Sequence, residues 1–173
     1  MGDADLLIFD ADGSLRRRAG NHRGAPRGPG DWVLLPGVRE TLMRLDWTRV
    51  RLGIATNQPD VALGRVSLAM ARGLIDEMLG AAGVPTAARL IEICPHDKKS
   101  DCICRKPMPG MIVRLLDAAR VTRGRAVMFG NAAIDRQAAR RAGVRYHDAP
   151  LLFQQEHTAI AAVRAITQSV TPT

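Results

Sequence analysis

Aromatic residues and long apolar runs are both scarce in this sequence. Phenylalanine, tryptophan and tyrosine make up 3% of the 173 residues, too few for the stacking surface that single-stranded nucleic acids use. No apolar run approaches the roughly 18 residues of a membrane span. The first five residues include two aspartates and no basic residue, so a secretory signal is not expected. These absences predict a cytoplasmic protein with no membrane partner.

Lysine is rare among the basic residues, although the net charge is +8 and the isoelectric point is near 10.6. The lysines are Lys98, Lys99 and Lys106, and the arginines are spread along the chain with one denser patch at Arg16-Arg17-Arg18. A basic surface of this kind fits a polyanionic partner such as a nucleic acid, and it also fits ordinary solvated arginines. Because aromatics are few, the nucleic-acid partner is the less favoured interpretation.

The length and the order of apolar segments predict a single α/β domain covering residues 1–173. Short apolar runs alternate with helix-like segments, which favours a central parallel sheet flanked by helices. The expected strands are 5–10, 50–55, 90–94, 125–129 and 143–146. The expected helices are 36–46, 59–82, 109–120, 132–142 and 156–167. Residues 16–31, rich in glycine, proline and arginine, are expected to form an irregular excursion.

Two carboxylates follow the first expected strand. Asp10 and Asp12 stand one residue apart and are followed by Gly13, which lets the backbone turn. At the end of a strand both can face one crevice, where one acid attacks or binds a metal and the other moves protons. The alternative is a solvated aspartate-rich turn. A calcium loop is excluded because its sixth and twelfth positions hold Leu15 and Asn21.

Further polar residues follow the other expected strands. Thr56 and Asn57 end the second strand and form either a phosphate cradle or a simple helix N-cap. Lys106 precedes a helix start, where its cation could meet a phosphoryl oxygen. Asn131 ends the fourth strand, and Asp135 lies four residues on, on the same helical face if the helix starts promptly.

All three cysteines lie within one short segment and surround a histidine. Cys94, His96, Cys102 and Cys104 can provide three thiolates and one imidazole, a closed tetrahedral set typical of structural zinc. An odd number of cysteines argues against a disulfide framework. The alternative is reduced thiols in a flexible loop. We therefore predict a zinc-binding loop over about residues 94–106.

These motifs together resemble the haloacid dehalogenase superfamily of phosphatases. The resemblance rests on Asp10-x-Asp12-Gly13-Ser14, Thr56, Lys106 and Gly130-Asn131-x-x-x-Asp135, which occur in the order of the superfamily's four motifs. The segment from Cys94 to Met111 is similar to the zinc-loop branch (subfamily IIIA), which includes heptose bisphosphate and histidinol-phosphate phosphatases. The resemblance implies a Rossmann-like fold without a large cap domain.

The resemblance also implies an activity: hydrolysis of a phosphomonoester through an aspartyl-phosphate. Asp10 would attack phosphorus, and Asp12 would protonate the leaving oxygen and later activate water. Mg²⁺ would bind Asp10, the carbonyl of Asp12 and Asn131, with Asp135 as a possible outer partner, and Zn²⁺ would be structural. The residues expected to hold the substrate phosphate are Thr56, Asn57, Arg105 and Lys106. The implied substrate is a small phosphorylated metabolite, most like heptose bisphosphate, and the enzyme is expected to be monomeric.

One departure from the family pattern keeps other functions open. Position 131 is asparagine where the family usually has aspartate, so the site offers one negative charge fewer to a hard cation. This change fits a natural variant that relies on Asp135, an engineered substitution or a weakened enzyme. Two alternatives therefore stand beside a metabolite phosphatase: a nucleic-acid 3′-phosphatase, and a catalytically weakened binding module that keeps the zinc loop.

Overall fold

The structure, a computed structural model, describes residues 5–20 and 22–154. The strands are β1 (Asp5–Phe9), β2 (Arg16–Arg18), β3 (Trp32–Leu34), β4 (Val50–Asn57), β5 (Arg89–Cys94), β6 (Ala126–Gly130) and β7 (Arg145–Asp148). The helices are α1 (Val38–Leu42), α2 (Leu68–Ala81), α3 (Gly110–Ala119), α4 (Ala133–Ala142) and α5 (Ala149–Gln154). Short 3₁₀ turns at Thr86–Ala88 and Arg123–Arg125 precede β5 and β6.

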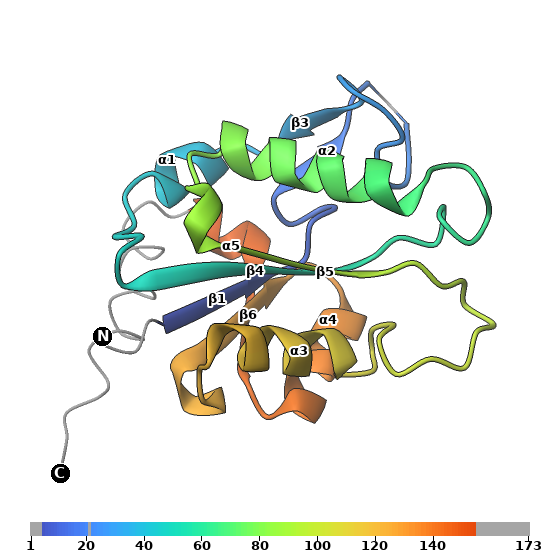
Figure 1. The fold of residues 1–173 in the computed structure, drawn as a ribbon. Helices are drawn as coiled ribbons and strands as arrows, with labels where there is room; N and C mark the ends of the chain where they lie inside the picture. The colour runs from blue at the N-terminus through green and yellow to red at the C-terminus, as the bar shows by residue number, and fades with distance from the viewer. Residues whose placement is uncertain (1–4, 21, 155–173) are drawn as a thin grey trace, which may run out of the picture.

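The central layer is a five-stranded sheet in the order β5-β4-β1-β6-β7, and every neighbouring pair in it is parallel (Figure 1). The chain adds β4 and β5 on one side of β1 and then returns to add β6 and β7 on the other. Such a reversal leaves a crevice outside the carboxyl ends of the strands, where α/β proteins bind ligands. The predicted parallel α/β sheet is confirmed.

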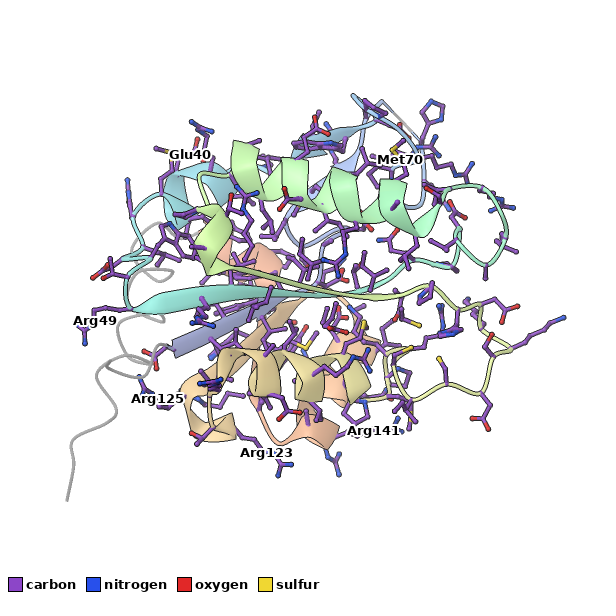
Figure 2. All side chains as sticks on the ribbon, in the orientation of Figure 1. Glu40, Arg49, Met70, Arg123, Arg125 and Arg141 are labelled. Carbon is purple, nitrogen blue, oxygen red and sulfur yellow. The ribbon has the colours of Figure 1, made fainter. Side chains whose placement is uncertain are left out.

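Helices cover both faces of this sheet, which explains why the central strand is apolar after its first residue, Asp5. All five residues of β1 are buried. Leu7 and Phe9 join the core under α1, α2 and α5, whereas Leu6 and Ile8 join the core under α3 and α4. Figure 2 shows the side chains filling both layers between sheet and helices. The alternation along β1 therefore fixes which way the strand's last residues face.

Two expected elements differ from the structure. Residues 16–31 are not wholly irregular, because Arg16–Arg18 pairs with Trp32–Leu34 as an antiparallel hairpin; residues 16–34 are called the arm below. The helix expected from residue 59 begins only at Leu68, where the Ser67 side chain accepts from the backbone N–H of Met70 at 3.0 Å. Before it the chain forms turns, one of which contains Gly64 with φ +66°.

The remaining differences are small. Strand β4 runs two residues further than expected, to Asn57. The helix expected at residues 156–167 lies outside the described residues. Between β1 and β4 the described chain holds only the arm and α1, and between β4 and β5 it holds α2, so neither interval contains a large cap. No helix in the described part of the chain is long and apolar enough to cross a membrane.

Candidate active site

A buried lysine joins two of the predicted acids at the carboxyl end of the sheet. The Nζ atom of Lys106 lies 2.6 Å from Oδ1 of Asp10 and 2.7 Å from Oδ1 of Asp135. Asp10 directly follows β1, Asp135 lies in the first turn of α4, and Lys106 ends the loop after β5. Residues separated by more than a hundred positions thus form one charged cluster.

Burial and neighbouring charges both shift the pKa values of Asp10 and Lys106. Burial raises the pKa of Asp10 to about 6, with the negative charge of Asp135 adding to the rise and the cation of Lys106 opposing it. Burial would lower the pKa of Lys106, but the two carboxylates outweigh that effect and raise it. Lys106 therefore stays protonated and gives the site a fixed positive charge beside the candidate nucleophile.

The carboxylate of Asp12 is held at both of its oxygens. Nε of Arg16 donates to Oδ1 at 2.8 Å, and Nε2 of Gln58 donates to Oδ2 at 2.6 Å. Gly13, with φ +87°, turns the chain immediately after Asp12, and a Cβ at this position would stand 2.2 Å from Nδ2 of Asn131. Glycine is therefore required here by both backbone conformation and space.

Thr56 and Asn57 lie at the end of β4, next to the charged cluster. The hydroxyl of Thr56 is buried and accepts from Gln58 Nε2 at 3.0 Å. The side chain of Asn57 makes two bonds to the backbone of Lys106: its Nδ2 donates to the carbonyl at 3.1 Å and its Oδ1 accepts from the N–H at 3.0 Å. Asn57 thus fixes the backbone that carries Lys106.

Asn131 and Asp135 follow β6 at the carboxyl edge of the sheet. Oδ1 of Asn131 accepts from the hydroxyl of Ser14 at 3.3 Å. Oδ2 of Asp135 accepts from the backbone N–H groups of Asn131 and Ala132 at 3.2 and 3.1 Å, which caps α4.

The donor set at this end of the sheet fits Mg²⁺. A carboxylate oxygen of Asp10, the carbonyl oxygen of Asp12 and Oδ1 of Asn131 are of the donor type that hard cations prefer. Because Lys106 and the start of α4 engage both oxygens of Asp135, that residue supports the site from outside. Asn131 makes this set less negative than an aspartate would.

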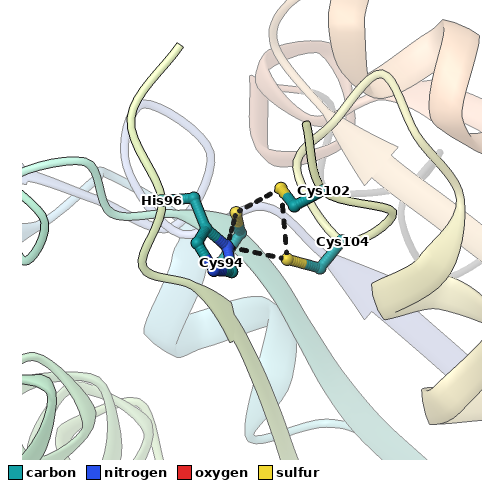
Figure 3. Close-up of side chains that lie close together, drawn as sticks. All are labelled: Cys94, His96, Cys102 and Cys104. Carbon is teal, nitrogen blue, oxygen red and sulfur yellow. Dashed lines mark hydrogen bonds between the residues drawn. The ribbon is translucent and has the colours of Figure 1, made fainter. Parts of the chain in front are cut away.

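The four predicted zinc ligands come together on the loop after β5 (Figure 3). The Cys94 sulfur lies 3.5 Å from Nδ1 of His96 and 3.8 Å from the Cys102 sulfur. The Cys104 sulfur lies 3.2 Å from His96 Nδ1 and 3.5 Å from the Cys102 sulfur. A tetrahedral zinc ion with bonds of about 2.0–2.3 Å separates its ligands by about 3.5–3.8 Å. The cluster therefore has the size of a zinc site.

The zinc loop is joined to the active site through its last residues. Nη1 of Arg105 donates to the backbone carbonyl of His96 at 2.8 Å, so a member of the Cys/His cluster orients Arg105. Lys106 follows directly and enters the charged cluster. The loop can thus set the position of two predicted phosphate-binding cations at once.

A cavity of about 620 Å³ opens beside Asp12 and Asn57. Its walls come from the arm, from the turns after β4 and from the zinc loop. The arginines that line it include Arg17, Arg23, Arg27, Arg65 and Arg105. Arg27 and Arg65 both contact Asp60, at 2.7 and 3.1 Å, whereas Arg17 and Arg23 contact no carboxylate among the described residues. The cavity is therefore positively charged and suited to an anion.

The parallel sheet, the acids at its carboxyl edge and the bridging lysine define a hydrolase of the haloacid dehalogenase type. The match to the haloacid dehalogenase-like hydrolase family spans residues 4–143, and the chain belongs to this family. This confirms the enzyme class and the family predicted from the motifs.

Similar proteins named in this family are phosphatases. The chain is 33% identical over 153 residues to the D-glycero-beta-D-manno-heptose-1,7-bisphosphate 7-phosphatase of Bordetella bronchiseptica, covering 86% of this chain and 80% of that one. It is 30% identical over 142 residues to the enzyme of the same name from Pseudomonas aeruginosa, covering 78% and 75%.

A solved structure of a heptose bisphosphate phosphatase also resembles this chain. The crystal structure of the heptose bisphosphate phosphatase of B. bronchiseptica, complexed with magnesium and phosphate, matches with a TM-score of 0.71 and 29% identity, covering 82% of this chain and 78% of that one. A putative phosphatase of Mesorhizobium loti matches with a TM-score of 0.66 at 22% identity, which shows a shared fold.

Sequence reasoning missed two side chains that contact Asp12. Arg16 was grouped with its neighbours as a surface patch, although alternation along a strand separates Arg16 and Arg18 from Arg17. Gln58 directly follows Asn57, and no pattern in the sequence singles it out. A strand period across the arginine run places Arg16 and Arg18 on one side and Arg17 on the other, which would have indicated that the three arginines do not share one surface.

Proposed function

We propose that this protein is a magnesium-dependent phosphatase that forms an aspartyl-phosphate on Asp10. The observation that carries the proposal is the buried Lys106 cation in contact with Asp10 and Asp135 at the ligand-binding edge of the sheet. A carboxylate approaches a phosphate dianion only where cations offset their repulsion. Lys106 provides that charge without leaving its place.

Asp10 and Asp12 divide the chemistry in this proposal. A carboxylate oxygen of Asp10 forms a bond to phosphorus while the ester P–O bond breaks. Asp12, having first taken a proton from solvent through the exposed part of its carboxyl group, gives that proton to the departing oxygen. Asp12 then takes a proton from water as that water attacks the aspartyl-phosphate, which releases phosphate and restores Asp10. Lys106 and the Thr56 hydroxyl hold the phosphoryl oxygens. Mg²⁺, held by Asp10, the Asp12 carbonyl and Asn131, would neutralise charge on the phosphoryl group.

We further propose a sugar bisphosphate of the heptose type as the substrate. The relatives named above support this choice, and so does the cavity beside Asp12. Its arginines offer positive charge to a second anionic group on the molecule whose first phosphate is cleaved. A charge-assisted contact of that kind contributes about 1.5–3 kcal/mol, or about 10–100-fold in kcat/KM.

The experiment is a phosphatase assay over four substrates with Mg²⁺ present. Heptose-1,7-bisphosphate is expected to exceed heptose 7-phosphate and histidinol phosphate by about 10–100-fold in kcat/KM. The Asp10→Asn variant serves as the control and is expected to lose activity by about 10³-fold or more.

The same assay decides the second candidate, a nucleic-acid 3′-phosphatase, which the arginines of the arm favour. A 3′-phosphorylated oligonucleotide cleaved faster than any sugar phosphate would overturn the sugar proposal. Activity on none of the four substrates would favour a binding module instead.

A further inference from the structure

Arg16 is a buried cation that the proposed chemistry leaves unused. Its side chain is 1% exposed, whereas the next residue of β2, Arg17, is exposed. Arginine is almost never fully buried unless it is paired, because removing its charge from water is costly. The partners of Arg16 therefore indicate what its burial accomplishes.

The contacts of Arg16 join Asp12 to helix α2. Nε donates to Oδ1 of Asp12 at 2.8 Å, and Nη1 donates to the carbonyl of Leu74, in the middle of α2, at 2.9 Å. A backbone hydrogen bond holds Arg16 close to Asp12, because the N–H of Gly13 donates to the carbonyl of Arg16 at 2.7 Å. The guanidinium is thus fixed at both ends.

The second oxygen of Asp12 is fixed just as firmly. Gln58 is also 1% exposed, and its Nε2 donates to Asp12 Oδ2 at 2.6 Å and to the Thr56 hydroxyl at 3.0 Å. Donors from the arm and from the end of β4 therefore hold the two oxygens. The Asp12 side chain itself stays 23% exposed and lines the cavity, so it is oriented without being closed off.

We infer that Arg16 is the positioning residue for Asp12 and holds the carboxyl group where it transfers protons to and from substrate and water. The inference rests on the proposed phosphatase function. Guanidinium suits this task because it stays charged throughout and does not compete for the transferred proton. Proton transfer by a positioned side chain is worth about 10²–10⁴-fold in rate, and it requires hydrogen-bonding reach to the reacting atom.

The test compares Arg16→Met with the unmodified enzyme on two kinds of substrate. With a sugar phosphate, kcat is expected to fall by about 10–100-fold while KM changes by less than about threefold. With p-nitrophenyl phosphate, whose leaving group needs no proton, the variant is expected to release a burst of p-nitrophenol equal to the enzyme present. Slow turnover follows the burst, because hydrolysis of the aspartyl-phosphate still needs Asp12 as base.

Two further variants separate positioning from stability. Arg89→Met is the matched control, because Arg89 also pairs with a carboxylate and a carbonyl of α2, both of Asp76, away from Asp12. It is expected to lose stability and keep kcat. Arg16→Lys is expected to restore part of kcat, and it replaces Arg16→Met in the burst assay if that variant does not fold.

The outcomes are distinct. If Arg16→Met keeps kcat within about threefold, or if its loss follows the folded fraction with no burst, the inference is wrong while the phosphatase proposal stands. If the unmodified enzyme hydrolyses neither substrate, the proposed function fails first.

Discussion

At the residue scale, position 131 bears on the charge of the proposed magnesium site. Asn131 stands where an aspartate is expected, and its Oδ1 accepts a hydrogen bond from Ser14 at 3.3 Å. The amide still offers one oxygen to a cation, but it carries no negative charge. Since Lys106 already contacts both Asp10 and Asp135, the crevice holds little excess negative charge for a divalent cation.

Replacing Asn131 with Asp is expected to strengthen Mg²⁺ binding. The added carboxylate restores one negative charge beside Asp10, and the Mg²⁺ concentration for half-maximal activity is expected to fall by about tenfold or more. Magnesium titrations of turnover measure this directly. Asn131→Ala, which removes the oxygen without adding charge, is the control and should shift the titration the other way. An unchanged midpoint in Asn131→Asp would remove position 131 from the metal site.

At the scale of elements, the site is assembled by segments that wrap the carboxyl edge of the sheet. Asp60 joins two of them, because Arg27 of the arm and Arg65 of the turns after β4 both contact its carboxylate. Burial acts to raise the pKa of Asp60, but hydrogen bonds from Arg27 and Arg65 hold it below its ordinary value of 3.8. The ionised form therefore stabilises the walls of the cavity.

The Asp60→Asn variant is expected to lose about 1 kcal/mol of stability at pH 7, since both partner arginines are partly exposed. An acid with a lowered pKa stabilises the fold above its unfolded-state pKa, and that contribution disappears as the pH falls through the folded-state value. The difference between variant and unmodified protein should therefore shrink between pH 5 and pH 3. Denaturant titrations at several pH values measure it, and a difference that is constant with pH would exclude the ion pairs as its cause.

The zinc loop also contributes to the wall of the cavity, through Arg105. Loss of the zinc ion should therefore affect catalysis through the positions of Arg105 and Lys106. Cys102→Ser is expected to reduce bound zinc below about half an equivalent and to lower kcat/KM by about tenfold or more. Ile103→Ser is the control, because Ile103 lies in the same loop, is 71% exposed and is not a ligand. Elemental analysis and activity on the same samples test the link. Full zinc content in Cys102→Ser would show that the thiol is not a ligand.

Features that depend on residues close together in the sequence could be predicted, whereas features that depend on distant residues could not. Strand β1 is marked by a short apolar run and the helix after Pro109 by the proline before it, and both appear where expected. The zinc ligands were found because they lie close together in the sequence. The hairpin of the arm was missed, because its strands are three residues long and depend on pairing across a long turn. Gln58 was missed for the same reason, since only the folded chain brings it to Asp12 across 46 residues. Arg16 is four residues from Asp12, and it was missed because the three-residue strand that directs it inward was not expected.

At the scale of the whole molecule, the net charge of +8 creates an attraction for anions of any size. Salt separates a confined substrate from an extended one, because each phosphate contact on a nucleic acid releases counterions. For a sugar bisphosphate, kcat/KM is expected to fall less than about tenfold between 50 and 200 mM salt, whereas six or more phosphate contacts would cost about 10³-fold. Steady-state rates at a few ionic strengths measure this slope. A steep loss with the sugar substrate would contradict a confined site.

Lys106 touches both Asp10 and Asp135, and this arrangement has a consequence for the protein during its synthesis. Asp10 is translated well before Lys106, which lies 96 residues further along the chain, and before Asp135, which follows Lys106. Until then the carboxylate has no fixed positive neighbour to draw a phosphate toward it. In the proposed mechanism, a nascent or truncated chain that ends before residue 106 is therefore expected to lack phosphatase activity.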